Sequence, residues 1–360
     1  MIEVTFVTDA PRIAGSEIWL LTHLPRLRQQ GFSPRVLLPN TKILNEYAQH
    51  LEYSGVPVHR FPNLAEAALQ TTNAHLRVIQ AWSPATYNFL LTRLPSPKAA
   101  LIHDQLEYHY PAGVRGLYRL VYRLTKSRAL MRSDALITVS RWGARFMEQY
   151  LGLSKVLSVC NGVDAERFKP NPQQREALRQ GYGFRHFTVL VPGRMALEKN
   201  ALASIRTARL APELEFVFVG DDDSSIGMTV KWLARYWRLN NVRFLGKRWD
   251  MPQLYQAADA VLQPTLAENQ SLVTLEAMAS ALPVVTTPIP SQAELITHEH
   301  DGLLVPAHPE ALAEVLRKLA HSSALTARLG AAARTRILNN HTLEHSTDAL
   351  AQVLARLIQN

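Results

Sequence analysis

The sequence has very little cysteine and no long apolar segment. Cys160 is the single cysteine among 360 residues, which excludes an internal disulfide and a cysteine-based metal site and is typical of a reducing compartment. No apolar run reaches the length of about 18 residues that a membrane-spanning helix needs. The start of the chain lacks the basic segment of a signal peptide and indicates a strand instead. We therefore expect a cytoplasmic protein, bound at most peripherally to the cytoplasmic face of a membrane.

Acidic residues are fewer than basic ones, and the shortage is uneven along the chain. The net charge is +9, and residues 1–165 contain 18 Lys and Arg against 11 Asp and Glu, compared with 21 and 19 in residues 166–360. The first half should therefore prefer an anionic partner, such as a phosphate-bearing acceptor or an anionic membrane surface. Because no basic-aromatic motif of a nucleic-acid reader occurs, we expect no nucleic-acid partner.

Short apolar runs alternate with helical patterns along the whole chain. This alternation predicts an α/β fold with parallel sheets, and the length favours two domains. The proline- and glycine-containing segment 169–183 indicates a linker between the domains. Strands are expected at 3–8, 35–38, 56–61, 78–82, 99–104, 134–140 and 156–160, and in a second series at 187–191, 214–219, 242–245, 259–263, 283–287 and 302–305. Helices are expected at 16–30, 113–132, 200–210, 228–239 and 251–257, from about 272, and over much of 310–358.

The segment 264–279 combines a strand end with a polar helix start. Pro264 closes the preceding strand, since proline cannot donate into a ladder. Asn269 or Ser271 can cap the helix that follows, and Leu272 and Val273 lie in its first turn, where free amide groups attract a phosphate. Glu268 precedes the helix and Glu276 lies about one turn inside it, so these acids can bind hydroxyl groups on either side of the phosphate.

A second polar turn follows the strand 187–191, about 70 residues upstream. Gly193 permits a tight turn. Arg194 and Lys199 place two cations just beyond the strand end, where open parallel sheets bind ligands. Together with the helix start and the two glutamates, these cations predict a site for a sugar attached to a diphosphate.

The two segments together resemble retaining glycosyltransferases of family 4 (glycosyltransferase group 1). The resemblance rests on Gly193-Arg194 followed by Glu198-Lys199-Asn200, and on two glutamates separated by seven residues and running into Leu-Glu-Ala-Met-Ala. It implies the GT-B fold, in which two Rossmann-like domains face a central cleft. The expected division is an acceptor-binding domain at 1–168, a nucleotide-sugar-binding domain at 169–340, and a C-terminal helix at 341–360 that packs back on the first domain.

The resemblance also implies roles for individual residues. Catalytic roles fall on His103, Arg194, Lys199 and Glu268, with His109 as the alternative histidine. Donor-binding roles fall on Gly15, Ser16, Arg194, Lys199, Phe244, Asn269, Gln270, Ser271, Leu272, Val273 and Glu276. Gly15-Ser16 stands where the family has a glycine-rich turn, and the Gly-x-Gly-x-x-Gly fingerprint of dinucleotide-binding proteins is absent. The resemblance implies no cofactor and no metal, so we interpret Asp221–Asp223 as solvated acids.

The predicted helix 113–132 admits two interpretations. Its arginines recur every four residues and leucines and valines fill another face, a pattern suited to lying on an anionic bilayer. The alternative is an ordinary surface helix whose apolar side packs into the core, and we favour this interpretation for the packing. Membrane contact stays a hypothesis at this point.

The implied activity is transfer of a sugar, with retention and without a metal, from a UDP- or GDP-linked donor to a hydroxyl group of a glycan, lipid-linked or small-molecule acceptor. The sequence departs from the family where most relatives have Glu-Gly-Phe-Gly and this chain has Glu268-Asn269-Gln270-Ser271. Side chains of Asn269 or Gln270 can therefore contact the sugar. Two other functions remain open: a sugar phosphorylase on the same fold, and a non-catalytic protein that binds nucleotide sugars.

Overall fold

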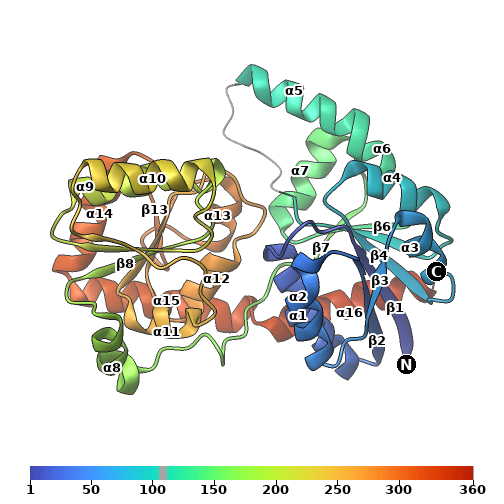
Figure 1. Cartoon of the computed structure of the whole chain (residues 1–360), viewed down its shortest axis with the longest axis horizontal. Helices are drawn as coiled ribbons and strands as arrows, with labels where there is room; N and C mark the ends of the chain where they lie inside the picture. Colours follow the sequence, from blue (N-terminus) through green and yellow to red (C-terminus); the bar gives the residue numbers. More distant parts are fainter. Residues whose placement is uncertain (105–111, 360) are drawn as a thin grey trace. The chain divides into compact units, whose positions relative to one another are not determined.

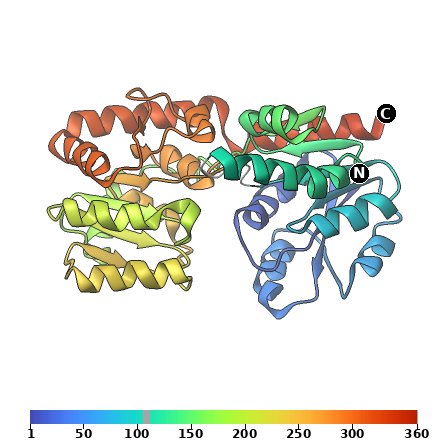
Figure 2. The same cartoon turned by 90° about the horizontal axis from the view of Figure 1, so that it is seen from above.

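The computed structural model describes residues 1–104 and 112–359, which form two compact units. One unit comprises Met1–Gly162 and Leu343–Asn360, and the other comprises Val163–Thr342. Each consists of one parallel sheet with helices packed on both faces (Figures 1 and 2). Within the described residues, none of the helices is both long and apolar enough to cross a bilayer.

The described part of the first unit contains a seven-stranded parallel sheet with the order β3-β2-β1-β4-β5-β6-β7. Its strands are β1 (Ile2–Thr8), β2 (Phe32–Pro39), β3 (Val58–Phe61), β4 (Leu76–Gln80), β5 (Lys98–Ile102), β6 (Ala135–Thr138) and β7 (Val156–Ser158). Its helices are α1 (Gly15–Gln29), α2 (Asn45–Tyr53), α3 (Leu64–Gln70), α4 (Pro84–Arg93), α5 (Ala112–Tyr122), α6 (Arg128–Leu130), α7 (Arg141–Leu151) and α16 (Leu343–Gln359).

The second unit repeats this plan with a six-stranded sheet in the order β10-β9-β8-β11-β12-β13. Its strands are β8 (Thr188–Pro192), β9 (Glu215–Val219), β10 (Val242–Phe244), β11 (Ala260–Gln263), β12 (Val284–Thr286) and β13 (Leu303–Leu304). Its helices are α8 (Pro172–Tyr182), α9 (Ala201–Leu210), α10 (Ser225–Tyr236), α11 (Met251–Ala257), α12 (Leu272–Ala279), α13 (Pro290–Leu295), α14 (Pro309–His321) and α15 (Ser323–Asn340). The predicted α/β class with two Rossmann-like parallel sheets is confirmed.

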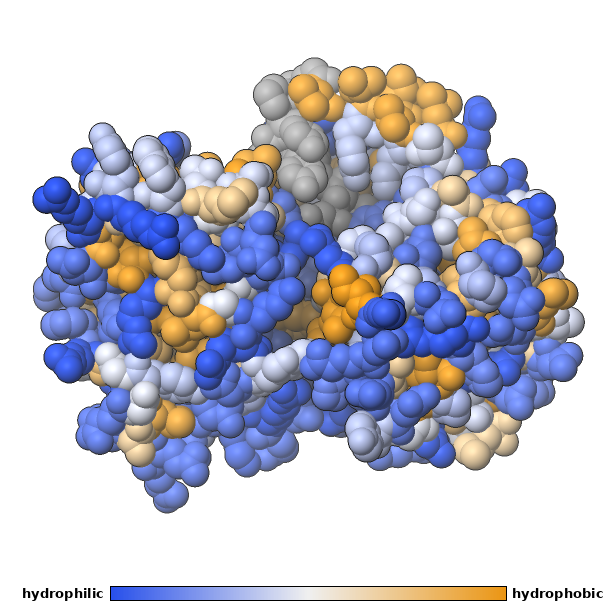
Figure 3. All heavy atoms as spheres, viewed as in Figure 1, coloured by the Kyte–Doolittle hydropathy of each residue, from blue (hydrophilic) through white to orange (hydrophobic). Residues whose placement is uncertain are grey.

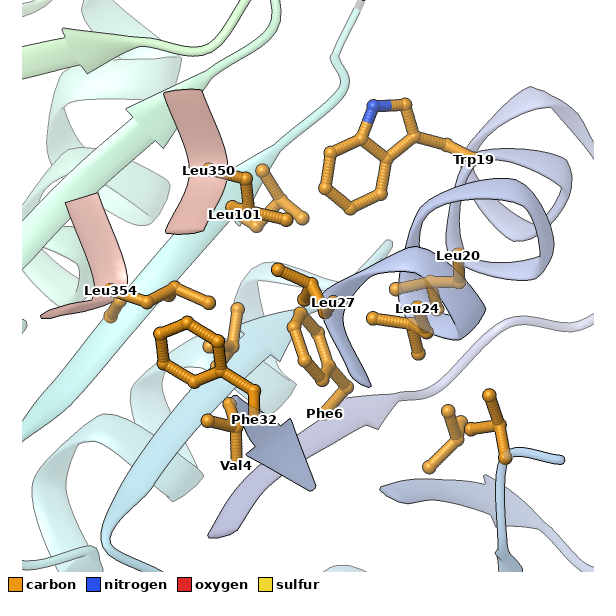
Figure 4. Close-up of a cluster of buried hydrophobic side chains, with 14 of the residues drawn as sticks. Val4, Phe6, Trp19, Leu20, Leu24, Leu27, Phe32, Leu101, Leu350 and Leu354 are labelled. Atoms are coloured by element: carbon orange, nitrogen blue, oxygen red, sulfur yellow. The ribbon is translucent and has the colours of Figure 1, made fainter. Parts of the chain in front are cut away.

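The C-terminal helix α16 belongs to the core of the first unit. Leu350 and Leu354 of α16 are buried in the cluster that contains Phe32 and Leu101 (Figure 4). On the same helix, Ser346 Oγ donates to the carbonyl oxygen of Cys160 at 2.6 Å. The expectation that the final helix returns to the first domain is therefore confirmed, because its apolar face completes one side of that sheet.

The predicted linker at 169–183 is wrong, because most of this segment is the helix α8. Asn171 caps it by accepting from the amide of Gln174 at 3.3 Å, and Gly183 ends it with a φ of +69°. None of the residues of α8 is buried. Two arginines anchor α8 to the rest of the unit instead, since Arg175 and Arg179 form ion pairs with Asp259 at 2.6 and 2.9 Å.

The predicted basic helix is present, but its apolar side does not pack into the core. It runs through α5, a π-helical turn at Arg123–Ser127, and α6. Leu117 and Leu124 are exposed, whereas Tyr122 and Lys126 are buried. The interpretation as an ordinary surface helix with a buried apolar face is therefore wrong.

Candidate active site

The candidate site of the second unit lies where its strand order reverses. β8 pairs with β9 on one side and with β11 on the other, so the connections that leave β8 and β11 run to opposite directions of the sheet. A crevice forms at such a switch point, outside the carboxyl ends of the strands, and ligands bind there in open α/β sheets. The two polar segments singled out in the sequence are the loops that follow β8 and β11.

The loop after β8 carries the two predicted cations. Gly193 has a φ of +130°, a conformation that favours glycine, and its amide donates to Val219 O at 2.8 Å. Arg194 then forms an ion pair with Glu198, with Nη2 2.7 Å from Oε1. A short 3₁₀ turn, Leu197–Lys199, leads into α9. Arg194 and Lys199 line the same small pocket as Gln263 and Pro264.

A largely buried ion pair joins this loop to the loop after β11. Lys199 Nζ contacts Glu268 Oε1, and the side chains are 19% and 7% exposed, so water screens their attraction poorly. The carboxylate of Glu268 also accepts from Gln263 Nε2 at 3.2 Å. A second link is the hydroxyl of Thr265, which donates to Glu198 O at 2.9 Å. The structure thus brings Arg194, Lys199 and Glu268 together.

The start of α12 is linked to this group of charges through Gln263, whose Nε2 donates to Ser271 Oγ at 2.8 Å as well as to Glu268. Ser271 Oγ caps the helix by accepting from Thr274 N at 3.2 Å. Helix geometry leaves the amides of Leu272 and Val273 without an intrahelical acceptor, which creates a positive end suited to an anion. Asn269 and Gln270 precede the cap and are buried. They occupy the positions where the family resemblance implies glycine and phenylalanine.

Glu276 lies one turn farther along α12 and has an unusual environment. Its Oε2 accepts from Tyr255 Oη on α11 at 3.0 Å. Burial raises the pKa of Glu276 to about 7, although the Tyr255 hydrogen bond and the nearby charge of Arg167 oppose this shift. A carboxyl group with this pKa is partly protonated near neutral pH and can either accept or donate a hydrogen bond.

The raised pKa of Glu276 predicts a pH dependence of stability. Between about pH 4.5 and pH 7 the native state keeps a proton that the unfolded state has lost, so the free energy of unfolding should decrease as pH rises, by at most about 1.4 kcal/mol per pH unit. Glu276→Gln should remove this decrease. Urea unfolding at several pH values measures it, with the exposed Glu310→Gln as control. A slope that is unchanged in Glu276→Gln would contradict the assignment.

Two other sequence expectations concern β10 and the acids after β9. Phe244 packs against Phe218 with ring centroids 5.2 Å apart, so its ring contributes to the hydrophobic core. Asp221 and Asp222 form ion pairs with Lys247 at 3.4 Å and Lys231 at 2.6 Å. Among the described residues, no cluster of three or more histidine, cysteine or acidic side chains has a geometry that would hold a metal ion.

The first unit has a switch point of its own, between β1 and β4, and its predicted site residues lie at the strand ends near it. Ser16 follows β1 at the start of α1, and His103 follows β5. Gln80, the last residue of β4, joins them: its Nε2 donates to Ser16 O at 3.1 Å, and its Oε1 lies 3.0 Å from His103 Nε2. Gly15 begins α1. The alternative histidine, His109, lies outside the described residues.

Burial determines the charge of His103, and the contact with Gln80 determines which ring nitrogen carries the proton. Burial lowers the pKa of His103 to about 4, so the ring is neutral near pH 7. Because the amide nitrogen of Gln80 donates to Ser16, its oxygen faces the ring, and Nε2 of His103 carries the proton. Nδ1 is then an acceptor, which suits His103 to orienting a hydroxyl group rather than to supplying a proton.

Sequence reasoning missed two glutamines that organise these sites. Gln80 ends β4 and Gln263 ends β11, and each of these strands pairs with the first strand of its own unit across the switch point. Gln263 bonds Glu268, and also Ser271 at 2.8 Å, whereas Gln80 bonds Ser16 and His103. The available signal was a polar residue at the end of an otherwise apolar strand.

Comparison with known families identifies both halves of the chain. Residues 13–167 match the family described as Glycosyltransferase Family 4, and residues 186–322 match the family described as Glycosyl transferases group 1. The two matches therefore cover most of both units.

Curated relatives align over part of their length. The chain is 26% identical over 215 residues to the UDP-Gal:alpha-D-GlcNAc-diphosphoundecaprenol alpha-1,3-galactosyltransferase of Escherichia coli, covering 57% of this chain and 56% of the relative. It is 30% identical over 256 residues to the putative glycosyltransferase EpsD of Bacillus subtilis, covering 67% of this chain and 66% of the relative. The chain thus spans between half and two thirds of the length of these two relatives.

Solved structures agree over the full length. Anabaena HepE in complex with UDP and glucose superposes with a TM-score of 0.84 at 21% identity, covering 99% of this chain and 100% of that chain. A glycosyltransferase from Rickettsia africae superposes with a TM-score of 0.83 at 18% identity, covering 100% and 99%. At these identities the likeness shows the fold. Together with the family matches, it shows that the chain belongs to glycosyltransferase family 4 (glycosyl transferases group 1) and has the GT-B fold.

Proposed function

We propose that the protein transfers a sugar from a nucleoside-diphosphate donor to a hydroxyl group of an acceptor. The observation that carries this proposal is the convergence of Arg194, Lys199 and the first amides of α12 beside Glu268, at the switch point of one sheet. Two cations and a helix N-terminus suit a diphosphate, and the carboxylate beside them suits the hydroxyl groups of a sugar.

The names of similar proteins support a uridine nucleotide as the first donor to test. The Escherichia coli relative is named for a UDP-Gal donor and a lipid-diphosphate acceptor, and the HepE structures contain UDP or UDP-glucose. GDP-linked sugars belong in the same test, because the names of similar proteins do not specify which nucleobase this chain binds. The acceptor class extends from lipid-linked saccharides to glycans and small molecules.

The chemistry of the donor assigns a role to each charge. As the bond from the sugar to the diphosphate breaks, negative charge grows on the leaving oxygen, and Arg194 and Lys199 stabilise it without needing a metal ion. Glu268 holds Lys199 in place before the donor binds and then contacts the sugar. Glu276 binds the ribose hydroxyl groups. The configuration is retained when the leaving oxygen accepts the acceptor's proton on the same face of the sugar.

The first unit is proposed to bind the acceptor. Its cations outnumber its acids, which suits an acceptor that carries phosphate. The neutral ring of His103 orients a sugar hydroxyl through Nδ1.

Asn269 and Gln270 of the second unit replace the glycine and phenylalanine that the family resemblance implies, so their amide groups contribute to the choice of sugar.

A thermal-shift screen followed by a transfer assay tests the proposal. A nucleoside diphosphate at about 100 times its dissociation constant stabilises the native state by about 2.7 kcal/mol, so UDP or GDP should raise the melting temperature clearly above the effect of inorganic phosphate. The stabilising nucleotide sugar should then be consumed when an acceptor is added. Stabilisation by phosphate with phosphorolysis of a glycoside would indicate a phosphorylase, and binding without turnover of any donor would indicate a non-catalytic protein.

A further inference from the structure

The helix formed by α5 and the following π-helical turn turns its aliphatic face away from the first unit. Five side chains form what we term the apolar stripe: Val114, Leu117, Leu120, Val121 and Leu124. They are between 44% and 61% exposed. Figure 3 shows a continuous run of hydrophobic atoms along this helix. The stripe spans about 15 Å along the helix axis, at 1.5 Å per residue.

The opposite face of the helix explains this orientation. Asp104, two residues after β5, accepts from Tyr122 Oη at 2.8 Å and from Lys126 Nζ at 2.6 Å. Lys126 also lies over the ring of Tyr87, 4.8 Å from its centroid. The buried ammonium group of Lys126 needs this carboxylate, because an unpaired buried charge is costly. The aromatic and polar side of the helix therefore faces the sheet, and the aliphatic side remains outside.

The whole charge excess of the first half of the chain lies in the segment 112–145, which contains this helix, β6 and the start of α7. Residues 112–145 contain seven arginines and one lysine against the single acid Asp134, whereas the rest of residues 1–165 contain ten basic and ten acidic residues. Arg123, Arg128 and Arg132 are exposed. An exposed apolar stripe set in a basic surface is complementary to a surface that is apolar inside and anionic at its boundary.

From this combination we infer that α5 docks the protein on an anionic lipid bilayer. The apolar stripe enters the boundary between head groups and acyl chains, and the arginines at its sides contact lipid phosphates. A second copy of this chain fits the surface less well, because two faces of the same positive charge repel each other. This inference stands on the exposure and charge of α5 and does not depend on the proposed reaction.

Co-sedimentation with lipid vesicles tests the inference. The protein should sediment with vesicles of phosphatidylcholine and phosphatidylglycerol, should not sediment with phosphatidylcholine alone, and should be released by salt. Arg123→Gln/Arg128→Gln should weaken binding about 30-fold, since each cation near an anionic surface contributes about one factor of five. Leu117→Gln/Leu124→Gln should weaken it at least about tenfold, because less apolar area enters the bilayer.

Matched controls separate this surface from general effects of charge and hydrophobicity. Ile43→Gln/Leu69→Gln changes two equally exposed apolar side chains of the same unit, and Arg206→Gln/Arg235→Gln removes two exposed arginines from the other unit. Both controls should bind like the wild type, and circular dichroism should be the same for all variants. The inference is overturned if the anionic vesicles do not bind the wild type, if the controls lose as much binding as the α5 variants, or if the stripe instead mediates a lipid-free dimer that Leu117→Gln/Leu124→Gln dissociates.

Discussion

Lys199→Ala should lower the turnover of a nucleotide-sugar donor by about 100- to 1,000-fold. The proposed role of Lys199 is to stabilise the charge that develops on the departing diphosphate, and removal of one such preorganised group costs about 2.7–4 kcal/mol in comparable sites. The lysine is held for this role, since its ammonium contacts Glu268 in a partly buried position. Steady-state release of the nucleoside diphosphate measures the effect, and it should appear in kcat.

The control for Lys199→Ala is a variant that loses a similar ion pair elsewhere. Lys231 bonds Asp222 at 2.6 Å in the same unit, and the two side chains are 33% and 14% exposed. Lys231→Ala should therefore cost a comparable amount of stability and leave turnover unchanged. Because Lys199→Ala leaves the Glu268 carboxylate without its cation, its melting temperature must be measured as well. Full turnover in a folded Lys199→Ala protein would refute the assignment of the site.

Gly220→Ala should weaken donor turnover about 100-fold although residue 220 carries no functional side chain. Gly220 follows β9 directly and has a φ of +139°, and a Cβ atom there would lie 2.2 Å from the carbonyl oxygen of Gly193. The clash is with backbone, so the loop that presents Arg194 has to move. A displacement of about 1 Å near the reacting groups is enough for a loss of about 100-fold. The strain should also lower the free energy of unfolding by about 2–5 kcal/mol.

A second glycine in the same unit provides the comparison for Gly220→Ala. Gly183 has a φ of +69°, and a Cβ atom there would meet nothing closer than Arg243 Nη1 at 3.8 Å. Gly183→Ala should cost only about 1 kcal/mol and should leave donor turnover intact. Urea unfolding and donor kinetics on both variants separate backbone strain from loop displacement. Equal activity of the two variants would show that the position of the Gly193–Arg194 peptide does not limit the reaction.

The helix α8 shows a local signal that composition obscured. Asn171-Pro172 at its start and Gly183 at its end are ordinary helix boundaries, since proline suits the first helical turn and glycine suits the left-handed residue after the last. The segment was nevertheless predicted as a linker, because its prolines and glycines were interpreted as helix breakers rather than as helix boundaries. Its contacts run to Asp259, about 80 residues away in sequence, which no local pattern contains.

The orientation of the helix 112–130 was decided by a single partly buried acid, Asp104. A periodic leucine face is normally the buried face of a surface helix. Here Tyr122 and Lys126 both donate hydrogen bonds to Asp104, so their side of the helix faces the sheet. The π-helical turn at Arg123–Ser127 then shifts the helical register, and Ala129 and Leu130 are buried beyond it. The helical pattern itself was predictable, but its rotation about the axis depends on a residue that lies outside the helix.

The sequence by itself determined the order of the elements, the two parallel sheets and the polar loops after β8 and β11. Periodicity, turn residues and capping act between near neighbours, and a sequence displays these directly. Only the tertiary structure decided which polar side chains meet: Lys199 with Glu268 across 69 positions, and Gln80 with both Ser16 and His103. Those contacts depend on how strand ends converge at a switch point, because burial there forces each charge and amide to find a distant partner.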